Sequence, residues 1–431
     1  MPTDARRCAY AVVRRVFEQD AYADRAFRAE ADRLELDGRD RAFAMSLAYG
    51  VVQQRATLDH VIESLSDRAA DRIDAPVLAA LRLGVHQLLF MDGVADHAAV
   101  AESVDLTKAA RSRGHGFVNA VLRRTAREGR ALVDGLGESS PAEAALRHSH
   151  PQWVAQAWWD QLGSRDAVDL MRTGNEPAES AARVNTLRGT REDVLAELAR
   201  EGVAARAAPH LPEGIVLEDP YDLHHSAAFE RGALMPQSRG SMMVARAVDP
   251  QPGERVLDLC AAPGAKTTHL AALTGDVGEV VAVEHDPQRG EDLRANAARL
   301  GARSVCVVVG DASRPDHGSG YDRVLVDPPC SDLGTLQSRP DARWRKTPEQ
   351  VEQLCSLQRR ILEAGAAAVR PGGRLVYSTC TISAPENERQ MEEFLERHPE
   401  FGLTKGGRFV QTLPHRDGTD GFFIAAFERH G

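Results

Sequence analysis

The spacing of hydrophobic positions divides the chain into three parts, and the first part is helical almost throughout. From about residue 4 to residue 132, apolar side chains recur at intervals of three and four, and no alternating strand pattern occurs. Two of these apolar stripes consist of Val12, Val13, Val16 and Phe17, and of Leu78, Leu81, Val85, Leu88 and Leu89. We therefore predict an all-α domain over residues 1–135. A glycine- and proline-containing linker follows at 131–149 and leads into a short helix.

The second part mixes short strands with helices. A helix begins near His150-Pro151-Gln152-Trp153, and we expect its Trp158 and Trp159 to lie in a core. Short β-rich runs at 182–186 and 214–217 enclose a helical stretch at 191–201. The pattern predicts a small α+β domain over residues 150–240, which links its neighbours and could contribute to RNA binding.

Strands and helices alternate regularly in the third part. The predicted strands are 255–260, 279–283, 304–309, 321–326 and 374–377, and an alternating apolar run at 421–427 closes the chain. Such alternation is typical of a parallel, doubly wound sheet with helices on both faces. We therefore predict a Rossmann-like α/β domain over residues 241–431. Ligands of such sheets bind outside the carboxyl ends of the strands.

Two of the predicted strands each end in a loop that carries a cysteine. The apolar run 324–326 stops at Asp327-Pro328-Pro329-Cys330, and the two prolines cannot extend a sheet. About fifty residues later, the strand 374–377 runs into Ser378-Thr379-Cys380. Because the carboxyl ends of parallel strands lie on the same side of a sheet, we expect both thiols in the same ligand-binding site.

The first turn of the third part predicts a nucleotide-binding loop of an unusual kind. It runs from Cys260 to Thr267 and contains neither the Gly-x-Gly-x-x-Gly fingerprint nor a P-loop. A ligand without a pyrophosphate fits it better, such as a nucleoside that carries an amino-acid tail. Glu284 follows at the end of the next strand, where a carboxylate can accept ribose hydroxyls. Asp311, after the third strand, could accept from an adenine amino group.

Two thiols beside a carboxylate and an ammonium suit one reaction on a pyrimidine. Carbon 5 of cytosine is too electron-poor to attack a methyl sulfonium unless a thiolate first adds to carbon 6. An acid near the ring nitrogen assists this addition, and a base later removes the proton from carbon 5. The candidates are Cys330, Cys380, Asp327 and Lys266, and Lys266 is notable because only four of the 53 basic residues are lysines.

The remaining cysteines and the charge balance exclude several classes of protein. No Cys-x-x-Cys pair occurs, which argues against a zinc site and against a disulfide framework. We expect Cys260, Cys306 and Cys355 to be inert core residues, because they fall within apolar patterns. The sequence has no secretion signal and no membrane-spanning run, so we expect a cytoplasmic protein without a membrane or metal partner.

The formal net charge of -10 does not by itself indicate a nucleic-acid partner. Between residues 108 and 130, however, basic side chains face a single acid, Glu128. Taken alone, this run is most simply a solvated helix face. Its basic residues are Lys108, Arg111, Arg113, Arg123, Arg124, Arg127 and Arg130.

The third part of the chain resembles the RNA cytosine-5 methyltransferases of the NOP2/Sun family. The resemblance rests on the segments 257–267, 327–331 and 378–381, which contain the first turn and the two cysteine loops. Supporting matches lie at 334–336, 339–341, 386–388 and 420–423. The helical part resembles the NusB RNA-binding domain, through residues 97–104 and 116–123. Together these parts resemble a bacterial 16S ribosomal RNA methyltransferase with a NusB-like domain.

The resemblance implies a methyl donor, a target and a role for each thiol. It implies S-adenosylmethionine as cofactor, a cytosine of 16S ribosomal RNA as target, Cys380 as nucleophile and Cys330 as the group that assists product release. Thiol chemistry alone does not say which cysteine attacks the base. In DNA cytosine methyltransferases the cysteine that follows a proline attacks, and that rule would have suggested Cys330. The implied cofactor contacts are Cys260, Ala261, Ala262, Pro263, Gly264, Ala265, Lys266, Glu284, Asp311 and Asp327.

The resemblance also changes the interpretation of the basic residues and exposes two departures. Opposite an RNA methylation site, the basic helix face is better explained by phosphate binding. We expect further phosphate contacts from Arg339, Arg343, Arg345 and Lys346. Ala265 stands where the family usually has a second glycine, and alanine tolerates a left-handed backbone poorly. Glu284 stands where the family usually has aspartate.

Under this hypothesis we expect the enzyme to be a monomer. Three alternatives to the hypothesis remain. The same chemistry could act on transfer RNA, because the catalytic core does not discriminate and only the NusB-like part favours the ribosome. A non-catalytic RNA-binding assembly factor would need no paired thiols, no Asp327 and no Lys266. A methyltransferase acting on an amino group would have an aromatic residue after the two prolines, where this chain has Cys330.

Overall fold

The computed structural model describes the chain except residues 1, 220 and 405–406, and it consists of two compact units. The helical unit contains Met1–Pro177 together with Leu336–Arg345. The α/β unit contains Ala178–Thr335 together with Lys346–Gly431. The chain therefore passes between the units at three points, after residues 177, 335 and 345.

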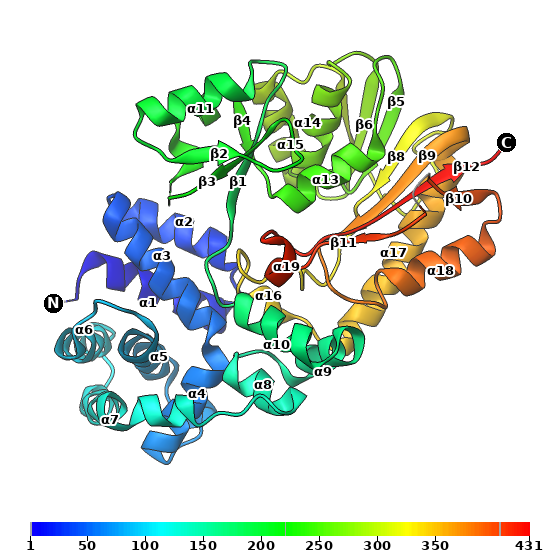
Figure 1. The fold of residues 1–431 in the computed structure, drawn as a ribbon. Coiled ribbons are helices and arrows are strands. Elements are labelled where there is room, and N and C mark those ends of the chain that lie inside the picture. Colours follow the sequence, from blue (N-terminus) through cyan, green and yellow to red (C-terminus); the bar gives the residue numbers. More distant parts are fainter. Residues whose placement is uncertain (1, 220, 405–406) are drawn as a thin grey trace. The chain divides into compact units, whose positions relative to one another are not determined.

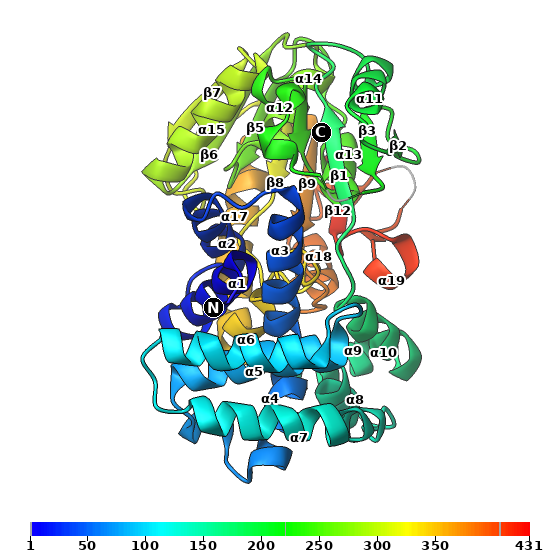
Figure 2. The same cartoon turned by 90° about the vertical axis from the view of Figure 1, so that its left-hand side faces the viewer.

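The helical unit confirms the prediction of an all-α amino-terminal part (Figure 1). Long helices with one apolar side bury that side together, and α5, α6 and α7 lie side by side (Figure 2). Val12 and Val13 lie in this core, and Trp158 is also buried, whereas Trp159 is only partly so. The helices are α1 (Asp4–Gln19), α2 (Ala23–Arg33), α3 (Gly38–Gln53), α4 (Arg55–Ser66), η1 (Ala70–Arg72), α5 (Ala75–Phe90), α6 (Asp96–Ala109), α7 (His115–Asp134), α8 (Pro141–Arg147), α9 (Gln152–Leu162), α10 (Ser164–Thr173) and α16 (Ala342–Arg345).

A small antiparallel sheet begins the α/β unit. Its strand order is β2-β3-β1-β4, and apolar residues of β1 and β3 pack against α11. Thr190 starts α11 with a capping box, in which its hydroxyl and the Asp193 carboxylate satisfy each other's backbone N–H groups. The elements are β1 (Ser180–Val184), α11 (Arg191–Arg200), β2 (Ala205–Ala207), β3 (Gly214–Leu217), η2 (Leu223–His225), α12 (Ala227–Glu230) and β4 (Leu234–Pro236).

The large sheet of the α/β unit has the strand order β10-β12-β9-β8-β5-β6-β7, with β11 beside β12. The strands β5 to β9 are parallel as predicted, but β10, β11 and β12 run antiparallel, so the sheet is mixed. β12 pairs with both β9 and β10, so the last strands extend the parallel sheet in the antiparallel direction. The elements are α13 (Arg239–Val248), β5 (Arg255–Leu259), α14 (Ala265–Leu273), β6 (Glu279–Glu284), α15 (Pro287–Leu300), β7 (Val305–Val309), β8 (Tyr321–Val326), α17 (Pro348–Ala368), β9 (Val369–Thr379), α18 (Glu388–Arg397), β10 (Phe401–Leu403), β11 (Val410–Gln411), α19 (Pro414–Asp417) and β12 (Phe423–Arg429).

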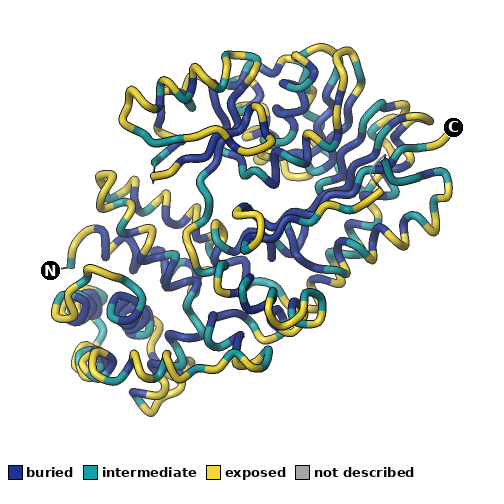
Figure 3. The backbone as a smooth tube through the Cα atoms, in the orientation of Figure 1, coloured by how far each residue is buried: buried dark blue, intermediate teal, exposed yellow. Residues whose placement is uncertain are grey.

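Helices cover both faces of the large sheet, as expected for a doubly wound fold. Successive side chains of a strand point to opposite faces, so Val324 and Val326 of β8 pack toward α17 and α18, whereas Leu325 packs toward α13 and α14. The central strands are therefore buried on both sides (Figure 3). This burial explains why the strands are nearly continuous hydrophobic runs in the sequence.

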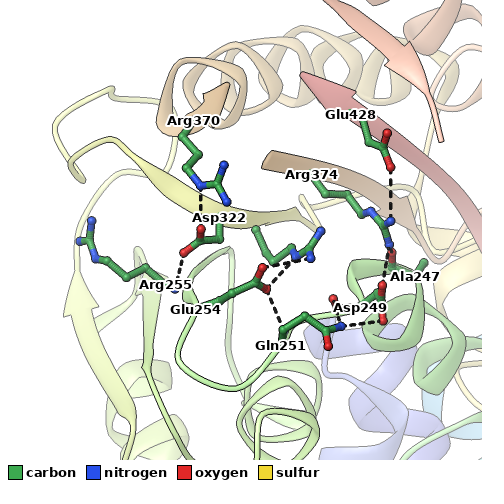
Figure 4. Close-up of polar contacts among 10 residues, drawn as sticks. Ala247, Asp249, Gln251, Glu254, Arg255, Asp322, Arg370, Arg374 and Glu428 are labelled. Carbon is green, nitrogen blue, oxygen red and sulfur yellow. Dashed lines mark hydrogen bonds and ion pairs between the residues drawn. The ribbon is translucent and has the colours of Figure 1, made fainter. Parts of the chain in front are cut away.

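The amino and carboxyl ends of the parallel strands carry different kinds of side chains. At the amino ends of the parallel strands, ion pairs connect neighbouring strands (Figure 4). Asp322 of β8 accepts hydrogen bonds from the Arg370 guanidinium and from the backbone N–H of Arg255, while Arg374 of β9 contacts Asp249 and Glu428. The carboxyl ends of the same strands carry the candidate chemistry.

One prediction about the cysteines is wrong. Cys306 was expected in the core, but its side chain is exposed, because β7 is the outermost strand of the sheet. Cys260 and Cys355 are only partly buried. Within the part of the chain that the structure describes, no helix has both the length and the apolar character that a membrane crossing requires.

Candidate active site

All the site residues predicted from the sequence lie along the carboxyl edge of the parallel strands or in the turns that follow them. Cys260 follows β5, and Lys266 lies in the first turn of α14. Glu284 is the last residue of β6, and Asp311 lies two residues beyond β7. Asp327 and Cys330 follow β8, and Cys380 follows β9 directly.

The two thiols face each other across this edge. Their Sγ atoms are 3.3 Å apart, and no disulfide joins them. Cys330 is 5% exposed, while Cys380 is more accessible. The burial of Cys330 and its hydrogen bond with Cys380 raise the pKa of the Cys330 thiol well above its ordinary value, the hydrogen bond being the larger cause. Cys330 therefore holds its proton more tightly than an ordinary thiol.

A close backbone approach fixes the loop that carries Cys380. The N–H of Gly334 donates to the carbonyl of Cys380 at 3.1 Å, and the N–H of Gly421 donates to the carbonyl of Gly334 at 2.7 Å. A Cβ at position 334 would lie 1.9 Å from the Gly421 oxygen and 2.9 Å from the Cys380 oxygen. Only glycine fits there.

A buried carboxylate ties the two cysteine loops together. Glu386 accepts hydrogen bonds from the backbone N–H and the hydroxyl of Ser331 at 2.9 and 2.5 Å, and from Gln358 at 2.9 Å. The hydroxyls of Ser331 and Thr381 are 2.6 Å apart. Since these residues adjoin Cys330 and Cys380, the network sets the spacing of the thiols. The segment 386–388 had been singled out only by resemblance.

Asp332 belongs to the site, although no motif in the sequence pointed to it. The Sγ of Cys380 donates to its Oδ1 at 3.2 Å, and the Sγ of Cys330 lies 3.9 Å from the same oxygen. Asp332 has a positive φ of 61°, a conformation that aspartate adopts more readily than most residues. Its carboxylate thus lies beside both thiols.

Lys266 and Asp327 form a largely buried ion pair next to the thiols. Lys266 Nζ lies 2.7 Å from Asp327 Oδ2, and Ser378 donates to Asp327 Oδ1 at 2.6 Å. Burial by itself lowers the pKa of Lys266, but the charge and the hydrogen bond of Asp327 outweigh it, and the pKa is raised above its ordinary value. The Lys266 ammonium also lies 5.2 Å from the centre of the Phe422 ring. The structure therefore keeps Lys266 protonated beside a carboxylate.

The first turn shows that Ala265 causes no backbone strain. Ala265 is the first residue of helix α14, and the left-handed positions are Cys260 (φ 70°) and Gly264 (φ 100°). A Cβ at position 264 would also lie 2.3 Å from a methyl group of Leu293. The expected difficulty with alanine does not arise, because the residue with the left-handed backbone is Gly264 and not Ala265.

The groups around this turn fit a nucleoside with an amino-acid tail. Glu284 is 4% exposed, and its carboxylate is oriented by the backbone N–H groups of Ala262 at 3.3 Å and Asp286 at 3.0 Å. Its remaining lone pairs can accept ribose hydroxyls. Hydrogen bonds from the side chain and backbone of Ser313 lower the pKa of Asp311 and keep it ionised. The N-terminus of α14 favours a carboxylate, as an amino-acid tail would provide.

Beneath the turn lies a carboxyl group with an unusual pKa. Asp258 of β5 is buried and accepts a hydrogen bond from the hydroxyl of Thr267 at 2.6 Å. Burial raises the pKa of Asp258 to about 7.

Arg289, for which the sequence predicted no role, donates to the carbonyl of Ala262 at 2.8 Å and lies 3.7 Å from Glu284. These contacts hold the turn against the ends of β5 and β6.

The basic residues expected to bind phosphate separate into two groups. On α7, Arg123 and Arg127 are exposed, as the sequence predicted, although Arg124 pairs with Glu128 at 2.8 Å. Arg343, by contrast, is 0% exposed, so the prediction is wrong for this residue. Arg345 pairs with two carboxylates, at 2.6 and 2.8 Å. The charge run around position 343 gave no sign of this burial.

Arg343 instead joins segments of the helical unit. Its guanidinium donates at 2.8 to 3.2 Å to the carbonyls of Gln53, Ser149 and Gly174 and to the side chain of Asn175. We predict that Arg343→Met lowers the unfolding free energy of the helical unit by about 3 to 5 kcal/mol, because buried acceptors lose their donors. Arg339→Met, at an exposed position, should change it by less than about 0.5 kcal/mol.

Tryptophan fluorescence during urea unfolding measures this effect selectively. The four tryptophans, Trp153, Trp158, Trp159 and Trp344, all lie in the helical unit. The salt dependence of RNA binding should be unchanged in Arg343→Met, whereas loss of a phosphate contact would reduce the slope by about one. A stable Arg343→Met protein with a reduced slope would contradict the structural role.

Family models match three parts of the chain. The chain matches the family model described as 16S rRNA methyltransferase RsmB/F over residues 245–428. It matches the NusB family over residues 3–127 and the ferredoxin-like domain of RsmF/B-like methyltransferases over residues 150–224. It is 34% identical over 452 residues to the probable ribosomal RNA small subunit methyltransferase B of Synechocystis sp., a match that covers 99% of each chain.

Solved structures show the same likeness. The crystal structure of PH0851 superposes with a TM-score of 0.86 and 28% identity, covering 100% of this chain and 99% of that one. The structure of NSun6 from Pyrococcus horikoshii with SFG has a TM-score of 0.61 and 26% identity. That match covers 65% of this chain and 98% of NSun6.

Proposed function

Because the chain belongs to the RsmB/F family of small-subunit ribosomal RNA methyltransferases, we propose that it methylates carbon 5 of a cytosine in 16S ribosomal RNA through a covalent intermediate. The observation that supports this chemistry is the pair of facing thiols, 3.3 Å apart, beside the Lys266–Asp327 ion pair. A methyltransferase that acts on an oxygen or an amino group would need no such pair. Cytosine carbon 5 does need a nucleophile.

The family depends on S-adenosylmethionine, and SFG is an analogue of that donor. When bound, S-adenosylmethionine supplies an electrophilic methyl group. The residues that would hold it are those of the first turn, from Cys260 to Lys266, together with Glu284, Asp311 and Asp327. Glu284 and Asp311 would accept hydrogen bonds from the nucleoside, and the start of α14 would face the carboxylate of the tail.

Cys380 is the nucleophile of the proposed reaction. Its sulfur bonds to carbon 6 of the cytosine as its proton leaves, and the ring electrons become available at carbon 5. The Lys266–Asp327 pair serves as the acid near the ring nitrogen, and Ser378 keeps Asp327 in place at 2.6 Å. The charge of a Cys380 thiolate is one of the influences that raise the pKa of Lys266, so the ammonium in turn favours the thiolate.

Cys330 assists the last step, in which the product leaves. After methyl transfer, the proton on carbon 5 must be removed before the carbon–sulfur bond can break. Cys330 would accept that proton as a thiolate, after its own proton has passed to solvent, and the electrons of the carbon–hydrogen bond re-form the ring double bond as the bond to Cys380 breaks. The Cys330 sulfur lies 3.3 Å from the nucleophile, within reach of that end of the ring. The target base must leave its stack to meet these groups. The exposed arginines of α7 would bind phosphates of the same RNA.

Nucleoside analysis tests this proposal. Unmodified small-subunit RNA and unmodified transfer RNA are each incubated with the protein and S-adenosylmethionine, digested and separated. We expect 5-methylcytidine from the small-subunit RNA. Its appearance in transfer RNA alone would support the alternative substrate, and its absence from both RNAs would indicate a non-catalytic assembly factor.

A further inference from the structure

We propose that Asp332 is the base that accepts the thiol proton of Cys380 when the nucleophile attacks. The proposal rests on the covalent mechanism above and adds a residue to it. A cysteine thiol is mostly protonated near neutral pH, with a pKa of about 8.5, so its proton needs an acceptor. The Cys330 sulfur is a poor acceptor in the resting site, because its hydrogen bond with Cys380 and its burial raise its pKa and keep its own proton in place.

The geometry around Asp332 favours this role. Its Oδ1 accepts a hydrogen bond from Cys380 Sγ at 3.2 Å but lies 3.9 Å from Cys330 Sγ, so the carboxylate is closer to the proposed nucleophile. A general base must lie within hydrogen-bond reach of the proton that it removes. Asp332 meets this condition before any substrate is bound.

The backbone of the turn at position 332 holds the Asp332 carboxylate beside the thiols. Its φ of 61° lies in the left-handed region, which aspartate adopts more readily than most residues. The carbonyl of Asp332 accepts from the backbone N–H and the hydroxyl of Thr335 at 3.1 and 3.0 Å, which fixes this turn. On the side of Asp332, both contacts use the backbone carbonyl, so neither of them occupies the carboxylate.

The proposed step balances as follows. The S–H bond of Cys380 breaks and its proton passes to the Asp332 carboxylate, while the sulfur electron pair forms the bond to carbon 6. When the product leaves, the carbon–sulfur bond breaks, its electrons return to sulfur, and the proton returns from Asp332. No oxidant, metal or additional reactant takes part.

Other ionisable groups also act on these thiols. Lys266 interacts electrostatically with Cys380, and Glu386 and Asp332 with Cys330. Asp327 is paired with Lys266 at 2.7 Å. A carboxylate as close as Asp332 makes the free Cys380 thiolate less stable, although it assists removal of the proton during attack. Removal of the carboxylate should therefore change two thiol reactions in opposite directions.

The test combines Asp332→Asn with Cys330→Ala, a background in which the covalent complex should accumulate. With small-subunit RNA and S-adenosylmethionine at pH 7.5, formation of the protein–RNA complex should be about a hundredfold slower than in Cys330→Ala alone. Without RNA, alkylation of Cys380 by iodoacetamide should be faster, because that reagent requires only the thiolate. Peptide mass spectrometry measures Cys380 separately from the exposed Cys306, which is the internal control.

The outcomes are distinguishable. If Cys330→Ala alone forms no complex, the covalent mechanism itself fails. If the complex forms at the same rate or faster without the carboxylate, Asp332 is not the base. Slowing of both reactions would also overturn the proposal, because it would show that Asp332 only shapes the loop. Asp332→Glu, which keeps a carboxylate, should recover part of the rate.

Discussion

The Cys330→Ala variant is expected to remain covalently attached to small-subunit ribosomal RNA after methyl transfer. Without the Cys330 thiol, the proton on carbon 5 is removed slowly, so the bond between Cys380 and carbon 6 persists. The complex should survive denaturation, and it is measured as a band of reduced mobility on a denaturing gel. Turnover should fall at least about a hundredfold, because a positioned acid or base contributes two to four powers of ten.

Replacement of the nucleophile should give the opposite result. Cys380→Ala should form no complex and lose at least about a thousandfold in methyl transfer, and the double variant Cys330→Ala/Cys380→Ala should also form none. Cys306→Ala is the matched control, because this thiol is exposed on the edge strand β7 and should not affect the reaction. A complex that survives the loss of Cys380 would reverse the roles of the two cysteines.

Asp327→Asn should reduce single-turnover methyl transfer by about two to three powers of ten. The amide keeps the size of the side chain but removes the charge that pairs with Lys266 at 2.7 Å. Because burial alone lowers the pKa of Lys266, the ammonium loses the partner that keeps it protonated. The acid near the ring nitrogen is then weakened. The rate should be measured at saturating S-adenosylmethionine, since Asp327 is also a proposed cofactor contact.

Asp322→Asn provides a matched control on the same strand. Asp322 lies near the amino end of β8, where it accepts from Arg370 at 2.7 Å and from the N–H of Arg255 at 2.8 Å (Figure 4). Its loss should cost roughly 1 kcal/mol of stability and leave the methyl-transfer rate unchanged. Equal rate losses in both variants would mean that Asp327 acts through the stability of the sheet.

The sequence predicted the fold well where periodicity and strand ends carry the information. Cys330 and Cys380 are fifty residues apart in the chain, but both follow the carboxyl ends of predicted parallel strands. That position alone predicted that they would lie close together, and their sulfurs are 3.3 Å apart. Two kinds of feature were not predictable in this way. The antiparallel direction of β12 depends on its connections, and the exposure of Cys306 depends on which strand lies at the edge.

The site residues that the sequence analysis missed or misassigned depend on tertiary contacts. Asp332 is one acid in a turn, and only the folded loop brings it to 3.2 Å from Cys380. Arg343 stands in a basic run that suggests a surface, and its burial depends on carbonyl groups more than a hundred residues away in sequence. A charged side chain gives no sign in the sequence of whether water or buried carbonyls surround it.

The three passages of the chain between its units limit how the protein can be divided. A fragment that begins at Ala178 would still carry Leu336–Arg345, the segment that belongs to the helical unit. In that fragment, the guanidinium of Arg343 and the indole N–H of Trp344 would lack the acceptors at Gln53 and Val52. Domain truncation or exchange would therefore succeed only if this internal excursion were redesigned together with the amino-terminal part, so the helical unit is not a detachable module.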